Sequence, residues 1–419
     1  MNNNTRFAPS PTGFSLHIGN LRVALFSYLY AKKNNGKFIL RIEDTDRNRY
    51  NKEAVNNIIN ALNYFNLIYD ELYYQSDRLD IYQEYADLLV FKGLAYVDNN
   101  CIRLNLKDVD SIMGYVGYDS LRNKEFLNKN NLTDIVLLKS DGYPTYHLAS
   151  VIDDHLMNIG VVFRGEEWLS TLPYHSYLYN CFGWDKPLFY HLPLIMSMDG
   201  KKLSKRDNSL SINYFIDRDY SKLAILNYIF RLGNSLPLDN EIYSIDKMIE
   251  LFDVDKLSCS PVKFDINYLR NLNIKCYRSE DGKNEIYDTL AKKYSNYNID
   301  ELYILYCNGM NVLDELYYPI IEKYHTINNM NDRMLLLYSY LINILKQCNK
   351  VFLTDDDVKE IIDKLYKYSF TTKEIHVYIR LAIQNKEKGL PADVLLKLFK
   401  ISDLIEIIDY ACDDSVLQT

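Results

Sequence analysis

The sequence lacks the features that mark membrane, secreted and metal-clustering proteins. Within its 419 residues no apolar run is long enough to cross a bilayer. The first residues carry neither a basic segment followed by an apolar one nor an arginine- and serine-rich presequence, so we expect a cytoplasmic protein with no membrane partner. The seven cysteines are scattered, without a CxxC pair or a Cys/His cluster at metal-ligand spacing. This spacing predicts free thiols and no protein metal site.

An excess of basic residues is also missing. The formal net charge is −8, which argues against indiscriminate coating of nucleic acid but is compatible with a local basic surface. Glycine and proline are rare inside the elements of the C-terminal third, where apolar residues recur at helical spacing. At 419 residues the chain is too long for one compact core, so we expect about two to four domains.

Strand and helix patterns alternate through the first half of the chain. Residues 38–42, FILRI, predict a buried strand, and residues 18–33 have apolar positions at helical spacing. A polar stretch at 96–136 interrupts the alternation, which resumes with strand patterns at 135–138 and 159–163. The sequence therefore predicts an α/β fold with a Rossmann-type doubly wound parallel sheet, a small insertion at 96–136 and an all-α C-terminal half.

A segment rich in proline and glycine joins the first predicted strand to the first helix. It reads APSPTGFSLHIGN at residues 8–20. In a doubly wound sheet this position offers an anion the free N–H groups and positive dipole of a helix start. His17 can donate to a phosphate oxygen, and Gly19 allows a ligand to approach the backbone closely. These features favour a triphosphate site, and a structural loop with an incidental histidine is the alternative.

A second segment, MDGKKLSKR at residues 198–206, places four basic residues after a tight turn. A mobile loop of this kind can fold over a triphosphate and neutralise the charge that develops as pyrophosphate leaves. A solvated surface loop, a targeting signal and a nucleic-acid patch are the alternatives for such a cluster.

Together, in this order on an α/β frame, the two segments resemble the HIGH and KMSKS signatures of class I aminoacyl-tRNA synthetases. Further segments are similar to bacterial-type glutamyl-tRNA synthetases, and these are RFAPSPTG at 6–13, FILRIEDTD at 38–46, KSDGYPTYHLA at 139–149, DDH at 153–155 and RGEEW at 164–168. The resemblance runs over most of residues 5–275. It implies a glutamate–tRNA ligase that uses ATP and Mg²⁺ to form glutamyl-adenylate and transfers glutamate to the 3′-terminal adenosine of tRNA(Glu). It leaves open whether tRNA(Gln) is a second acceptor.

The resemblance also implies a domain plan and a monomeric enzyme. Residues 1–95 and 137–206 would form the Rossmann catalytic domain, and residues 96–136 a shortened insertion that binds the acceptor stem. Residues 207–280 would contact the tRNA stem, and residues 281–419 would form a helical anticodon-binding domain.

Glutamate carries two carboxylates and one ammonium group, so its pocket needs cationic and hydroxyl donors together with an anion. By match to the family, the carboxylates would be held by Arg6, Tyr146 and Arg164, and the ammonium by Glu43 with Ala8 and Ser10. Ser150 is expected in the same pocket. For Glu43, a helix cap or a place in a metal cluster is the alternative.

The remaining assignments concern ATP and tRNA. His17 and Lys205 are the expected catalytic residues, which stabilise charge on the phosphates. The matching positions for ATP are Thr12, His17, Gly19, Asn20, Glu167, Leu194, Ile195, Lys202, Leu203, Ser204, Lys205 and Arg206. Contacts with tRNA are expected from Trp168, Arg270 and Lys275, although core packing of the ring and a solvated helical face are alternatives.

The chain departs from the family pattern in three places. Asn20 replaces the last histidine of HIGH, and three residues rather than the usual two separate Gly13 from His17. The stretch at 96–136 is much shorter than the acceptor-binding domain of relatives.

Four rival functions have different requirements. The segment PSPTG argues against a glutaminyl enzyme. The helical half argues against a shortened paralogue that glutamylates a modified tRNA base. A small-molecule nucleotidylyltransferase would not need Arg6 or Glu43. An inactive or specialised RNA-binding paralogue would be expected to have lost His17 or Lys205, and the sequence keeps both.

Overall fold

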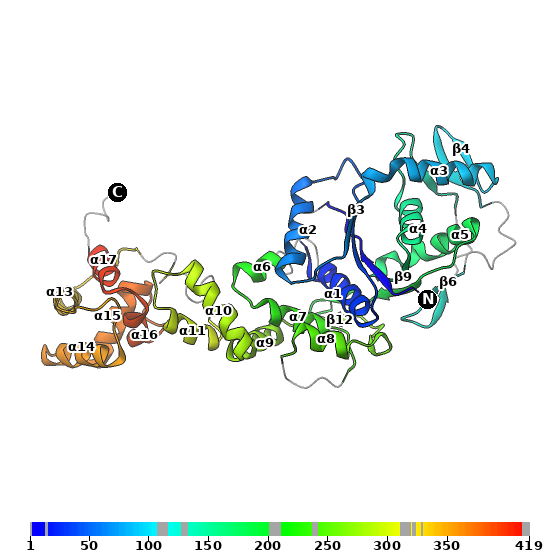
Figure 1. The fold of residues 1–419 in the computed structure, drawn as a ribbon. Coiled ribbons are helices and arrows are strands. Elements are labelled where there is room, and N and C mark those ends of the chain that lie inside the picture. The colour runs from blue at the N-terminus through cyan, green and yellow to red at the C-terminus, as the bar shows by residue number, and fades with distance from the viewer. Residues whose placement is uncertain are drawn as a thin grey trace. The chain divides into compact units, whose positions relative to one another are not determined.

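The chain folds as two compact units, one α/β and one helical (Figure 1). The computed structural model describes residues 2–12, 16–106, 116–126, 133–200, 211–236, 242–310, 320, 324–327 and 330–412. The N-terminal unit comprises Met1–Phe215 and Lys222–Leu269, and the C-terminal unit comprises Ile216–Ser221 and Arg270–Thr419. These bounds differ from the positions 207 and 280 expected from the sequence, and the functional division of the helical half stays a prediction.

A seven-stranded sheet forms the centre of the N-terminal unit, in the order β3-β2-β1-β9-β10-β6-β7. Its strands are β1 (Asn4–Phe7), β2 (Phe38–Ile42), β3 (Glu71–Tyr74), β6 (Gly117–Asp119), β7 (Lys124–Phe126), β9 (Ile159–Gly165) and β10 (Leu188–Leu192). Neighbouring strands are parallel except for the β6–β7 pair. The connections run outward from β1 through β2 to β3 and, on the other side, from β9 to β10. The order therefore reverses between β1 and β9, where such sheets bind ligands.

Helices cover the sheet and bury its apolar strands. Those of the N-terminal unit are α1 (Ile18–Lys33), α2 (Lys52–Tyr64), α3 (Leu79–Phe91), α4 (Tyr146–Leu156), α5 (Leu172–Phe182), α7 (Lys222–Arg231) and α8 (Ile245–Leu251). Helix α1 packs on β1 and β9, and α4 packs on β9 and α5. Every residue of β2 is buried, which explains its continuous apolar run with a single charged exception, Arg41. The parallel sheet and the helical second half agree with the sequence prediction.

The segment 96–136 was expected to be an insertion outside the sheet, but part of it belongs to the main sheet. Strands β4 (Ala95–Asp98), β5 (Cys101–Leu104) and β8 (Val136–Leu138) form a separate antiparallel sheet, but β6 and β7 join the main sheet. A Cβ atom at Gly117 would clash with Leu172, so glycine permits β6 to lie against α5. Strands of three residues are too short to show alternation, which is why this polar segment gave no strand signal.

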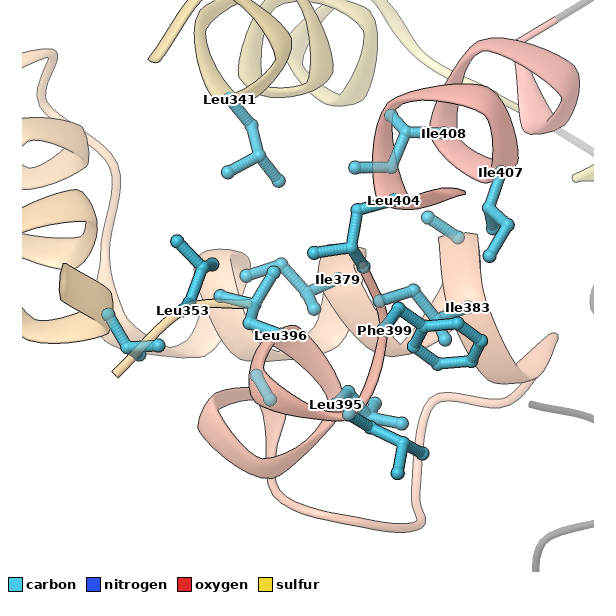
Figure 2. Packing of buried hydrophobic residues seen from close by; sticks show 14 of the residues in the cluster. Leu341, Leu353, Ile379, Ile383, Leu395, Leu396, Phe399, Leu404, Ile407 and Ile408 are labelled. Carbon is cyan, nitrogen blue, oxygen red and sulfur yellow. The ribbon is translucent and has the colours of Figure 1, made fainter. Parts of the chain in front are cut away.

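The C-terminal unit is entirely helical in its described part. Its helices are α10 (Glu280–Lys293), α11 (Ile299–Cys307), α13 (Asp332–Lys346), α14 (Asp355–Lys367), α15 (Thr372–Gln384), α16 (Ala392–Leu398) and α17 (Ile401–Ala411). Thr354 and Thr371 form capping boxes that fix the starts of α14 and α15. Figure 2 shows Leu341, Ile379, Leu396 and further apolar side chains of these helices turned toward one another.

Four further elements complete the description of the two units. They are α6 (Ile212–Asp217), α9 (Ile266–Arg278), β11 (Ile195–Met196) and β12 (Val262–Lys263). Strand β12 pairs with β11 in a separate two-stranded sheet of the N-terminal unit. Among the described helices none combines the length and apolar character needed to traverse a bilayer.

The apolar core of the C-terminal unit gives a direct test of its packing. Leu404 is fully buried (Figure 2), so Leu404→Ala should lower the free energy of unfolding of this unit by about 2 to 5 kcal/mol through lost burial and a residual cavity. Leu336→Ala is the matched control, because Leu336 is 47% exposed and its truncation should cost less than about 0.5 kcal/mol. Urea unfolding followed by circular dichroism measures both, and equal costs would contradict the assigned core.

Candidate active site

A cavity of about 430 Å³ lies at the point where the strand order reverses between β1 and β9. The ends of both strands, the start of α1, the start of α4 and the segment after β10 form its walls. The sequence-predicted residues that line it are Arg6, Ala8, Ser10, Thr12, His17, Gly19, Asn20, Glu43, Tyr146, Arg164, Glu167, Trp168, Leu194 and Ile195. Residues from widely separated segments therefore meet because the carboxyl ends of parallel strands share one edge of the sheet.

The other predicted residues do not line this cavity or lie outside the described part of the chain. Ser150 is fully buried behind the wall, where Arg41 Nη2 donates to its hydroxyl at 3.4 Å. Ser150 lies one turn after Tyr146 on α4 but does not line the cavity. Arg270 and Lys275 belong to the C-terminal unit. Lys202, Leu203, Ser204, Lys205 and Arg206 lie outside the described residues.

His17 caps helix α1 and is held in one tautomer. Its backbone is extended, with φ −100° and ψ 152°, and its Nδ1 accepts the N–H of Gly19 at 3.0 Å. In a neutral ring the proton must then reside on Nε2. A side chain at Gly19 would press within 3.3 Å of the His17 ring, so glycine leaves this arrangement undisturbed. The start of α1 thus offers a ring N–H and helix N–H groups to an anion.

Glu167 lies beside a buried arginine that the sequence reasoning missed. Arg22, on α1, lines the cavity and donates to the carbonyl of Pro193. Burial lowers the pKa of Arg22 to about 10, while Glu167 and Glu166 act in the opposite direction. A Cβ atom at Gly165 would clash with the Glu167 carboxylate, so the glycine that ends β9 makes room for this side chain.

One wall of the cavity is supported by a buried chain of ion pairs. Arg6 Nε donates to Asp154 Oδ1 at 3.1 Å, and Arg41 Nη1 donates to the same oxygen at 2.7 Å. Arg41 Nη2 donates to Glu43 Oε1 at 3.2 Å. Arg6 and Glu43 face the cavity and are held in place by Asp154 and Arg41, which do not line it.

Asp153 extends this buried network away from the cavity. It accepts from Arg78 Nε at 2.9 Å and lies 3.8 Å from Arg41 Nε. Gln75 Nε2 and the Tyr82 hydroxyl donate to its other oxygen at 2.9 and 2.8 Å. The network contains three arginines, Arg6, Arg41 and Arg78, and three carboxylates, Glu43, Asp153 and Asp154, so its formal charges cancel.

Two opposing effects set the pKa values of Glu43 and Asp154 in this network. Burial raises them, and ion pairing with arginine lowers them. Burial raises the pKa of Glu43, and Arg41 and Arg6 only partly oppose it. Burial would also raise the pKa of Asp154, but Arg6 and Arg41 reverse the shift and hold its pKa below the ordinary value. Asp154 is therefore the firmly ionised member, whereas Glu43 is the member whose charge a cationic ligand would stabilise.

Arg164, at the end of β9, is held differently from the other buried arginines. Its Nε donates to His191 Nε2 at 2.9 Å, and its Nη1 donates to the Tyr146 hydroxyl at 3.0 Å and lies 3.3 Å from His175 Nδ1. The guanidinium stands over the Phe189 ring, 5.0 Å from the centroid. Among the described residues no carboxylate pairs with it, and its buried Nη2 has no hydrogen-bond partner. A buried cation without a counterion is costly, so this position calls for an anionic ligand.

The imidazoles around Arg164 are neutral at physiological pH. Burial lowers the pKa of His191 to about 4, with an opposing effect of Asp119. Burial and the adjacent Arg164 lower the pKa of His147 to about 4 and that of His175 well below its ordinary value. Neutral rings can accept hydrogen bonds from the guanidinium without cancelling its charge.

Several residues that shape the site escaped the sequence reasoning. Arg41 carried a usable signal, because a charge inside a fully apolar strand must be paired, and His191 ends a strand as Arg164 does. His175 and Asp119 carried none, since they belong to separate elements, α5 and β6, and no sequence motif joins them. Within the described residues no group of three or more His, Cys, Asp or Glu side chains is placed to hold a metal ion.

Comparison with known proteins identifies sequence relatives of the whole catalytic region. A family model described as the catalytic domain of class I tRNA synthetases (E and Q) matches residues 3–102 and 98–271. The glutamate–tRNA ligase of Finegoldia magna is 36% identical over 385 residues, covering 74% of this chain and 77% of that protein. That of Chlamydia caviae is 33% identical over 460 residues, covering 92% of this chain and 88% of that protein.

Solved structures are similar over nearly the full length. A glutamate tRNA ligase from Elizabethkingia meningosepticum, crystallised in complex with its amino acid, matches with a TM-score of 0.71 and 27% identity, covering 97% of this chain and 98% of that chain. The glutamate-tRNA synthetase of Elizabethkingia anophelis matches with a TM-score of 0.69 and 28% identity, covering 98% and 99%. Both similarities extend through the helical half.

The buried ion network predicts a large cost for removing its shared carboxylate. Asp154→Asn leaves Arg6 and Arg41 without their common counterion and should lower the free energy of unfolding by about 3 to 5 kcal/mol. Asp46→Asn is the matched control, because the Asp46 pair with Arg49 is exposed and should contribute less than about 1 kcal/mol. Urea unfolding distinguishes the two, and a similar small cost for both would show that Asp154 does not organise the network.

Proposed function

Since the chain belongs to the glutamate–tRNA ligases of the class I aminoacyl-tRNA synthetase family, we propose that the cavity between β1 and β9 is where glutamate meets ATP. Members of this family use ATP to activate glutamate and then attach it to tRNA. The observation that carries the assignment of the cavity is the buried, uncompensated guanidinium of Arg164. It supplies a cation for a carboxylate, at the edge of the sheet where α/β proteins bind ligands.

Glutamate recognition in this proposal uses charges of both signs. Arg164, with Tyr146 beside it, and Arg6 would hold the two carboxylates, and Glu43 would hold the ammonium group with backbone and hydroxyl groups of Ala8 and Ser10. Arg164 would also favour a carboxylate over the neutral amide of glutamine, because only the carboxylate compensates its buried charge. Ser150 would act indirectly on glutamate binding, through its contact with Arg41.

ATP would bind along the start of α1. The Nε2–H of His17 would donate to a phosphate oxygen, Gly19 and Asn20 would admit the nucleotide, and Thr12, Glu167, Leu194 and Ile195 would line its pocket. The basic segment Lys202 to Arg206, with Lys205 as its catalytic member, would cover the phosphates. Arg22 adds a further buried cation on this side of the cavity.

The reaction would proceed by positioning and charge stabilisation without a covalent enzyme intermediate. The α-carboxylate of glutamate attacks the α-phosphorus of ATP, the bond to the β-phosphate oxygen breaks, and pyrophosphate leaves with its electron pair. His17 and Lys205 stabilise the negative charge on the phosphate oxygens. A hydroxyl of the terminal adenosine of tRNA then attacks the carbonyl carbon of glutamyl-adenylate, and AMP leaves.

Mg²⁺ is proposed as a companion of ATP and not as a resident of the protein. The described residues provide no protein-only metal cluster, and Mg²⁺ in nucleotide sites is held largely by phosphate oxygens and water. When bound, it would neutralise phosphate charge, and the residues above are assigned no contact with it.

The regions proposed for tRNA lie in both units. Residues 96–136 would meet the acceptor stem, and Trp168, which is 38% exposed and packs on Tyr146 with ring centroids 4.3 Å apart, could stack on a base. Arg270 and Lys275 would contact the stem within residues 207–280, and the helices of residues 281–419 would bind the anticodon. Anticodon contacts would also decide whether tRNA(Gln) is a second acceptor.

We further propose a cytoplasmic monomer. Free thiols at all seven cysteines support a reducing compartment. Sedimentation of the purified chain would test the oligomeric state.

Pyrophosphate exchange into ATP tests the proposed activity directly. We expect exchange that needs glutamate and tRNA together, is not supported by glutamine, and falls by about 10²-fold or more in Lys205→Ala, because a charge-stabilising cation is lost. Exchange is measured with glutamate and glutamine in parallel, with and without total tRNA. Absence of exchange under every condition, with tRNA binding intact, would instead favour an RNA-binding paralogue.

The raised pKa of Glu43 predicts an acid-sensitive affinity for glutamate. The KM for glutamate should rise as the pH falls from neutral through the raised pKa of Glu43, because protonation of Glu43 removes the anion that binds the ammonium group. Glu43→Gln should raise this KM by about 10- to 100-fold at neutral pH and abolish the corresponding part of the pH dependence. Exposed Glu53 provides the control Glu53→Gln, and an unchanged KM in Glu43→Gln would refute the ammonium-binding role.

A further inference from the structure

Behind the glutamate pocket, a row of side chains crosses three strands of the sheet. Arg164 on β9 is the direct neighbour of His191 on β10, and Phe189 on β10 is the direct neighbour of Asp119 on β6. Phe189 and His191 are two positions apart and therefore point to the same face of the sheet. Arg164, His191 and Asp119 thus lie on one face, in the order of their strands.

The contacts along this row fix the tautomer of His191. Its Nε2 accepts the Nε–H of Arg164 at 2.9 Å, so the proton of the neutral ring must reside on Nδ1. That Nδ1 faces Asp119 Oδ2 at 3.6 Å, and both side chains are fully buried. The negative carboxylate favours the N–H on the nitrogen that faces it, and consequently the lone pair on the nitrogen that faces Arg164.

Asp119 is well placed to stay ionised in this role. Its Oδ2 accepts from Arg122 Nη1 at 2.8 Å, and its Oδ1 accepts the backbone N–H of Leu121 at 2.9 Å. Burial would raise the pKa of Asp119, but the facing His191 ring, the Arg122 guanidinium and the backbone N–H of Leu121 outweigh it and hold the pKa below its ordinary value. Arg122 also donates to the carbonyl of His191, which ties β6 and its turn to the end of β10.

We propose that Asp119 is a positioning residue for glutamate, which acts through His191 to hold the Arg164 guanidinium in the orientation that binds a substrate carboxylate. This inference rests on the proposed role of Arg164. It assigns part of the segment 96–136, through β6, to amino-acid recognition in addition to tRNA binding.

The mechanism follows from what each state of His191 offers to Arg164. With the proton on Nδ1, the ring accepts from Arg164 Nε, and Nη2 of the guanidinium keeps its hydrogen-bonding capacity for the substrate. With the proton on Nε2, two N–H groups would face each other, and the guanidinium would have to rotate away. Loss of the Asp119 charge favours this second state, since an amide in its place can donate to Nδ1.

Steady-state aminoacylation of tRNA by the full chain tests the inference. Asp119→Asn should raise the KM for glutamate by about 10-fold or more, the effect of losing one hydrogen bond to a charged group, while the KM for ATP stays within about 2-fold of the unaltered chain. Asp70→Asn is the matched control. Asp70 also binds one cation and one backbone N–H, with Lys32 Nζ at 2.9 Å and Phe38 N at 2.7 Å, but lies outside the row.

A second pair of variants tests the inference even if the Asp119→Asn variant does not fold normally. His191→Gln keeps an acceptor for Arg164 and should leave the KM for glutamate within about 3-fold, whereas His191→Leu has no acceptor and should raise it by about 10-fold. If glutamine and leucine at position 191 behave alike, the acceptor role of His191 is wrong and the inference is overturned. A general structural defect would alter the KM for ATP and the melting temperature in both.

Arg164→Ala separates failure of the inference from failure of the proposed site. A raised KM for glutamate in Arg164→Ala together with an unchanged KM in a folded Asp119→Asn variant would overturn the role of Asp119 and leave the pocket assignment intact. An unchanged KM for glutamate in Arg164→Ala would overturn the pocket assignment itself, and with it the role of Asp119. Glutamate-specific weakening in both variants, absent from Asp70→Asn, is the result expected.

Discussion

The guanidinium of Arg41 belongs to a strand that is buried along its whole length, and the wall of the cavity that carries Arg6 and Glu43 depends on it. It binds Glu43 directly and shares Asp154 with Arg6. Burial would lower the pKa of Arg41, but Asp154, Asp153 and Glu43 raise it above its ordinary value. A buried pair is seldom more stable than apolar packing of the same volume, so the network is better understood as a device for geometry than for stability. It places a cation and an anion on the cavity wall at fixed positions.

Arg164 solves the opposite problem, because its charge must stay available. In the network each arginine has carboxylates as partners, whereas Arg164 contacts two imidazoles, a phenol and the face of a ring. Neutral acceptors orient the guanidinium while leaving its charge for a ligand. The pKa of His191 is about 4 and that of His175 is well below its ordinary value, so both rings are neutral and this arrangement holds across the physiological range. The pocket thus combines a network whose charges are balanced with an arginine whose charge is not. A substrate with two carboxylates and one ammonium group requires both.

The sequence predicted those parts of the site that lie at the ends of strands or in continuous motifs. Arg6, Glu43 and Arg164 end or follow strands and His17 starts the first helix, and the carboxyl edge of a parallel sheet brings such positions together. Side chains that act through register across the sheet were out of reach. The contact of Arg164 with His191 depends on how β9 and β10 align, and that alignment is set by packing over the whole sheet.

The fold of segment 96–136 was also only partly predictable from the sequence. Its polar composition correctly indicated a departure from the βαβ pattern, but composition cannot distinguish a separate insertion from one that contributes an edge hairpin to the main sheet. Two strands of three residues made that difference, and Gly117 and Asp119 are the buried residues of the first of them. Ser150 was expected in the pocket by resemblance to the family, yet it is fully buried and its hydroxyl accepts from Arg41 of another strand.

The position of β6 also constrains how far such a segment can be shortened. Strands β4, β5 and β8 form a sheet of their own, which packs on α3 and α4 and contributes no residue to the lining of the cavity. Strand β6 pairs with β10 and carries Asp119 to the face on which Arg164 lies. Removing β6 would expose the edge of β10 and leave His191 without the carboxylate that faces its Nδ1. A short segment in this place must therefore keep the β6–β7 hairpin, because the hairpin completes the sheet on which the amino-acid pocket is built.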